Sequence, residues 1–146
     1  MLRAVMAFFC AVAGAYVVGS VLATQVILAR IDAMGLPITL RDRLDATAHD
    51  LLGLASSYLP LIALAFLVAL PLAAWLGRYL PRGRVLLYGL AGAGAIVTIH
   101  VAIRLVLGLN GIAAVRDPHG LALQALAGCF GAYLFFVFTG QAHRPS

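Results

Sequence analysis

The sequence contains neither lysine nor glutamate, so all ten of its basic residues are arginine and all five of its acids are aspartate. Charged residues make up only 10% of the 146 residues, whereas about a quarter of a soluble domain is charged. Hydrophobic residues make up 64%, which is more apolar surface than a soluble fold of this length can bury. The scarcity of charge therefore argues against a soluble domain and predicts an integral membrane protein.

Cysteine is also scarce. The two cysteines, Cys10 and Cys129, lie in apolar segments and have no CxxC neighbour, so no thiol redox or zinc motif is present. The net charge of +5 is divided among loops without interleaved aromatic residues, which argues against a nucleic-acid partner. The use of arginine alone, with abundant alanine, glycine and leucine, indicates a GC-rich genome and hence a bacterial origin.

The long apolar segments contain no acid and only one histidine, His100. A b-type haem between helices needs two histidines at matched depth, so none is expected. Ser56 and Ser57 have no GxSxG context, and a metal site built from His49, Asp50 and His100 would lack a fixed ligand spacing. We therefore predict no catalytic residue, no metal and no cofactor, and a protein that is not an enzyme.

Four apolar segments are long enough to cross a bilayer as helices. They predict an all-α integral membrane protein whose four transmembrane helices form one bundle and a single domain over residues 1–146. The first segment has 26 residues without a charge, longer than the apolar core of a signal peptide, so we expect it to be retained. The predicted spans are about 4–29, 51–76, 85–109 and 120–140.

The connection between the first two spans contains a helix start signal. Gly35 and Pro37 end the first helix, and Thr39 followed by Asp42 has the spacing of a capping box. One interpretation is a short amphipathic helix on the periplasmic membrane surface, and the other is a polar first turn of the second span. In the first interpretation one apolar face carries Leu40, Leu44, Ala48 and Leu51. Within the second span, Pro60 and Pro71 are expected to kink the helix.

Charge asymmetry sets the predicted orientation. Five arginines without an acid share one side of the membrane, and all five aspartates fall on the other side. Because basic loops stay in the cytoplasm, we expect a bacterial inner-membrane protein with both termini cytoplasmic. The arginines on the cytoplasmic side are Arg3, Arg78, Arg82, Arg84 and Arg144.

A layer of polar side chains is predicted near the outer end of all four spans. His100 and Arg104 lie one helical turn apart, and both are costly in lipid unless they find partners. The candidate ligand-binding residues in this layer are His100, Arg104, Gln25, Gln124, Asp50 and His49. Arg104 offers a forked cation for a carboxylate or phosphate, and His100 offers a titratable group. The alternative is that these residues only hold the helices together.

We also expect Arg104 to point into the bundle and to contact Asp50 or Asp32, sharing a helix face with His100. Small residues recur on faces of the first, third and fourth spans, beyond what one four-helix bundle must bury. They predict a non-enzymatic subunit or assembly partner of a larger membrane complex, whose partners are the bilayer and other membrane subunits or a second copy. The alternative function is a small transporter or a lipid- or ion-binding protein using a pocket around His100 and Arg104.

Overall fold

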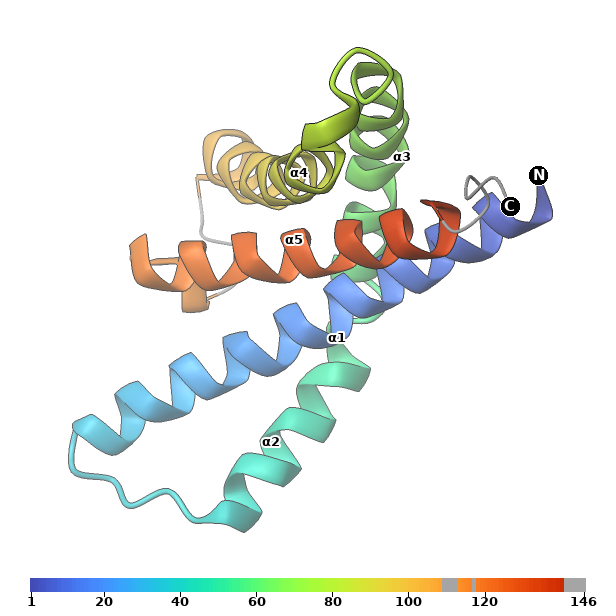
Figure 1. The fold of residues 1–146 in the computed structure, drawn as a ribbon. Helices are drawn as coiled ribbons and strands as arrows, with labels where there is room; N and C mark the ends of the chain where they lie inside the picture. The colour runs from blue at the N-terminus through green and yellow to red at the C-terminus, as the bar shows by residue number, and fades with distance from the viewer. Residues whose placement is uncertain (109–112, 117, 141–146) are drawn as a thin grey trace.

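The computed structural model describes residues 1–108, 113–116 and 118–140, and every regular element in those ranges is a helix (Figure 1). Four of the helices, α1, α3, α4 and α5, are long and apolar enough to cross a membrane. For the described residues, the prediction of an all-α protein with four helices long and apolar enough to span a membrane is thus confirmed. The elements are α1 Leu2–Ala33, α2 Leu40–Gly53, α3 Tyr58–Leu76, η1 Pro81–Gly83, α4 Arg84–Leu107, η2 Ala113–Arg116 and α5 Pro118–Gly140.

The predicted second span, 51–76, is divided between two elements. The last residues of α2 and the whole of α3 are separated by a break at 54–57. Pro60 explains where α3 begins, because its missing N–H is harmless among the first N–H groups of a helix, which have no partner within it. The expected kink at Pro60 is therefore wrong, and only Pro71 lies inside α3. The predicted exit turn at Asn110 and Gly111 lies outside the described residues.

The α2 helix is separate from α3 and has the predicted capping box. The Thr39 hydroxyl accepts from the Asp42 backbone N–H at 3.2 Å, and the Asp42 carboxylate accepts from the Thr39 N–H at 2.9 Å. Hydrogen bonds from Thr39, its hydroxyl first, lower the pKa of Asp42. Leu40 and Leu44 are 73% and 63% exposed, so these two leucines of the predicted apolar face point away from the protein.

Helix α5 lies between α1 and α4 and packs closely on both (Figure 1). A Cβ atom placed on Gly128 would lie 2.3 Å from the carbonyl oxygen of Gly92 in α4. A Cβ on Gly131 would lie 2.6 Å from the carbonyl oxygen of Ala11 in α1. Only glycine permits these backbone contacts, so small residues of α1, α4 and α5 pack the protein's own helices together.

The larger core side chains come mainly from α3, which packs against α4 and α1. Ile62, Phe66 and Leu70 repeat every four residues and are fully buried. They face the small residues of the neighbouring helices, as a Cβ on Gly131 would lie 3.0 Å from the Phe66 ring. Large side chains on one helix thus fill the space left by small ones on the others.

The first turn of α1 lies against the last turns of α5, where the Arg3 guanidinium donates to the carbonyl of Phe138 at 2.8 Å. The end of α3 and the start of α4 are joined by 77–83 and add three more arginines. The described aspartates lie elsewhere, in the last turns of α1 and in α2. We call the region of Arg3, Arg78, Arg82 and Arg84 the arginine-rich end.

Candidate functional site

A buried hydrogen-bond network joins α1, α3, α4 and α5. The Gln124 amide nitrogen donates to the carbonyl of Gly19 at 2.8 Å, and the Gln124 amide oxygen accepts from the Tyr58 hydroxyl at 3.0 Å. The Tyr58 hydroxyl also lies 3.2 Å from Nε2 of His100. Gln124, Tyr58 and His100 are each no more than 5% exposed, so these contacts replace water that cannot reach the site.

The hydrogen-bonding partners determine where each proton of the network lies. Because the Gly19 carbonyl can only accept, the Gln124 amide must present its nitrogen to Gly19 and its oxygen to Tyr58. The single hydroxyl proton of Tyr58 is therefore engaged with Gln124. His100 must then donate through Nε2–H to the Tyr58 oxygen, and a neutral ring carries a bare lone pair on Nδ1.

That Nδ1 atom of His100 is buried and has no hydrogen-bond partner. His100 and Arg104 line a small cavity of about 40 Å³ with Val101, Val115 and Leu121. A space of this size holds a water molecule or two but no larger solute. The arrangement therefore places an acceptor beside a small cavity between α4, η2 and α5.

A second set of polar contacts joins α2 to α1. The Thr24 hydroxyl donates to the carboxylate of Asp50 at 2.7 Å. The Gln25 amide donates to the hydroxyl of Thr47 at 3.2 Å and accepts from the Arg43 guanidinium at 2.9 Å. Asp50 and Gln25 are thus used to hold α2 against α1, away from the network around His100.

The structure does not form the predicted contact between Arg104 and an aspartate. The Arg104 side chain is exposed, and no ion pair joins it to Asp50 or Asp32. Asp50 is engaged by Thr24, and Asp32 accepts from the backbone N–H of Ile38. The physical reason is that Arg104 lies in the last turn of α4, where an outward guanidinium reaches the membrane interface without being buried.

The six predicted site residues therefore lie in different places in the structure and do not form one site. His100 and Gln124 are brought together through Tyr58, which was not among the candidates. Gln25 and Asp50 contact α2, while His49 is exposed. Tyr58 follows directly after two serines in an otherwise apolar segment, and this polar cluster is the sequence signal that could have singled it out.

The network contains hydroxyl, amide and imidazole groups, and no carboxylate within it could activate a nucleophile. Among the described residues, no group of three or more histidine, cysteine or acidic side chains is placed to hold a metal ion. Such a network is suited to fixing the positions of four helices relative to one another. In residues 1–108, 113–116 and 118–140, four helices are long and apolar enough to cross a membrane, as in a multi-pass helical membrane protein.

No protein-family model, curated protein or solved structure matches this chain.

Proposed function

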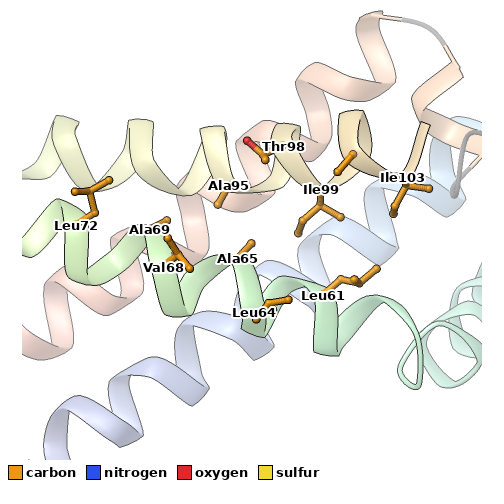
Figure 2. A pocket seen from close by; sticks show the side chains of 11 residues that line it. Leu61, Leu64, Ala65, Val68, Ala69, Leu72, Ala95, Thr98, Ile99 and Ile103 are labelled. Atoms are coloured by element: carbon orange, nitrogen blue, oxygen red, sulfur yellow. The ribbon is translucent and has the colours of Figure 1, made fainter. Parts of the chain in front are cut away.

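We propose that the protein is a non-enzymatic subunit or assembly partner of a larger membrane complex, and that a groove between α3 and α4 is its contact surface. The groove has a volume of about 470 Å³ and lies between α3 and α4 (Figure 2), and several of its leucine and valine side chains are exposed. Its lining is apolar except for the hydroxyl of Thr98. The lining residues are Leu61, Leu64, Ala65, Val68, Ala69, Leu72, Ala95, Thr98, Ile99, Ala102 and Ile103.

The single observation that carries this proposal is the alternation of large and small side chains along the groove. Ala65 and Ala69 lie one helical turn apart on α3, and Ala95 faces them from α4 (Figure 2). Leu64 and Val68 project at the rim and are 63% and 66% exposed. Small residues between large ones let a further helix approach closely, and close approach is what drives helix association in lipid.

From the sequence, the small-residue faces of α1, α4 and α5 were expected to contact a partner, but part of each face packs against the protein's own helices. Ala11, Gly92, Gly128 and Gly131 are used in contacts among the protein's own helices. The α3/α4 groove is an apolar surface that these contacts leave open. The cavity beside His100 and Arg104 is too small for a transported solute, so we do not propose a second function from it.

Site-specific photo-crosslinking in membranes tests the proposal. A photoreactive residue at Leu64, on the groove, should give one discrete protein adduct. The same residue at Leu90, which is 61% exposed on α4 but outside the groove, should give none. Lipid adducts alone at both positions would contradict the proposal.

A filling substitution gives an independent check. Ala69→Phe places a ring in the groove, whereas Ala13→Phe adds the same ring at an exposed position on α1. In mild detergent, we expect the partner to remain with the Ala13→Phe variant at wild-type stoichiometry and to dissociate from Ala69→Phe. Equal retention by both variants would rule out the groove as the contact surface.

We further propose that the protein resides in a bacterial inner membrane with both termini and the arginine-rich end in the cytoplasm. The support is the separation of Arg3, Arg78, Arg82 and Arg84 from the described aspartates. On this orientation α2 lies on the periplasmic side, where its exposed leucines would meet the membrane surface. Reporter fusions to the C-terminus and within α2 test the orientation, and a periplasmic C-terminus would contradict it.

A further inference from the structure

A cavity of about 240 Å³ lies at the arginine-rich end, where α3 ends, α4 begins and α5 ends. It is separate from both the His100 network and the α3/α4 groove. Its wall is partly apolar and partly polar, and it includes one cationic side chain. The lining residues are Ala74, Arg84, Tyr88, Phe135, Thr139 and Gly140.

Arg84 lacks a partner in this cavity. Its Nε atom is buried without a hydrogen bond, and the guanidinium forms no ion pair with any described residue. The side chain crosses Gly77, where an added Cβ would lie 3.4 Å from Nε and 3.5 Å from Cγ of Arg84. Apart from Nε, the Arg84 side chain is only partly buried and lines the cavity, so its guanidinium can donate to an anion that enters.

Tyr88 lies one helical turn after Arg84 and supplies a second donor. Its side chain is only 3% exposed, and its ring packs against Phe135 and Phe136 with centroids 5.9 and 5.6 Å apart. These contacts fix the ring, yet its hydroxyl forms no hydrogen bond within the described part of the chain. The Thr139 hydroxyl differs, because its proton is donated to the carbonyl of Phe135 at 2.6 Å.

We propose that this cavity binds a phosphate group through Arg84 and the hydroxyl of Tyr88. The two terminal nitrogens of a guanidinium offer paired N–H donors that match two oxygens of a phosphate, and the tyrosine adds a third donor. No described aspartate lies at this end to neutralise Arg84, while Arg78 and Arg82 nearby are exposed and add positive charge. The apolar wall formed by Ala74 and Phe135 suits the part of a lipid just below its headgroup.

The phosphate has two possible sources, a phospholipid headgroup and free inorganic phosphate, and a binding assay distinguishes them. The full-length protein, delipidated in an uncharged detergent at constant ionic strength, is titrated with dioctanoyl phosphatidylglycerol while its thermal stability is followed. Dioctanoylglycerol, which has the same chains without the phosphate, is the control ligand, and inorganic phosphate is the second probe. Saturable stabilisation by the phospholipid but not by dioctanoylglycerol is expected. Competition by millimolar inorganic phosphate would assign the site to the free anion.

Variants tie the binding to the cavity. We expect Arg84→Gln to weaken phosphatidylglycerol binding about tenfold, since it removes a charged hydrogen bond. Tyr88→Phe keeps the ring and should weaken binding about threefold. Arg82→Gln removes the same charge from an exposed position outside the cavity and should change binding less than twofold.

Two outcomes would overturn the proposal. One is the absence of saturable binding of either phosphate probe to the wild-type protein. The other is an equal loss of affinity in Arg84→Gln and Arg82→Gln, which would indicate attraction by surface charge alone. If Arg84→Gln does not give a monodisperse protein, Arg84→Lys and Tyr88→Phe decide, because unchanged affinity in both would exclude forked binding at this site.

Discussion

Replacing Tyr58 by phenylalanine removes one oxygen atom from the centre of the buried network and leaves the ring in place. Two hydrogen bonds are lost, one to the amide oxygen of Gln124 and one to Nε2 of His100. The side chain is 3% exposed, so water cannot take the place of the hydroxyl. A hydrogen bond between membrane helices contributes about 0.6 kcal/mol on average and at most about 1.7. We therefore expect a loss of about 1–3 kcal/mol in the free energy of unfolding.

The assay is reversible unfolding by SDS in lipid–detergent bicelles, followed by circular dichroism. Tyr79→Phe is the matched control, because Tyr79 is 71% exposed and its hydroxyl forms no hydrogen bond with the described residues. Its effect should stay within about 0.5 kcal/mol. Combining Tyr58→Phe with Gln124→Leu should cost less than the sum of the two, since both remove the same bond. If Tyr58→Phe is as mild as Tyr79→Phe, the network does not hold the helices together.

Three further predictions follow from local geometry. Gly128→Ala should lower the free energy of unfolding by about 1–3 kcal/mol, because its Cβ would overlap the backbone of α4. Gly94→Ala, whose Cβ meets nothing within 4 Å, should raise the free energy of unfolding slightly. The same SDS titration measures both variants. The pKa of Asp42 is lowered in the fold, so the capping box contributes fully above the ordinary value of about 3.9 and is lost as the pH falls through the lower folded value. Amide hydrogen exchange in the first turn of α2 should rise there, and Asp42→Asn should abolish the pH dependence. Nitrogen-15 NMR of His100 should show the proton on Nε2, and a proton on Nδ1 alone would refute the proton assignment in the network.

The spans and the capping box could be predicted because their signals are local. Hydropathy over about 20 residues identifies an apolar helix, and Thr39 with Asp42 identifies a helix start within four residues. The break between α2 and α3 was harder to predict, since the apolar run continues from Leu51 through it. Ser57, the N-cap of α3, and Pro60 mark the new helix start, and proline within a largely apolar run is read as easily as a kink.

The polar pairings could not be predicted because they depend on how each helix is rotated about its axis. Thr24 and Gln25 are adjacent, yet Thr24 is 2% exposed whereas Gln25 is only partly buried, and they contact different residues of α2. Adjacent residues differ by about 100° around a helix, and the packing of α5 on α1 fixes the rotation. Arg104 and His100 do share a cavity, as their spacing predicted, but depth alone could not show that the guanidinium is exposed.

The unequal lengths of α1 and α3 have a consequence for the membrane around the protein. With 32 and 19 residues, the two helices are about 48 and 28 Å long, against a hydrocarbon thickness of about 30 Å. An upright α3 matches that thickness, whereas α1 must tilt steeply or extend beyond it. Since both helices belong to one packed assembly, a thicker bilayer would cover more of α1 and stretch past the ends of α3. The stability of the protein should therefore depend on the acyl-chain length of the surrounding lipid.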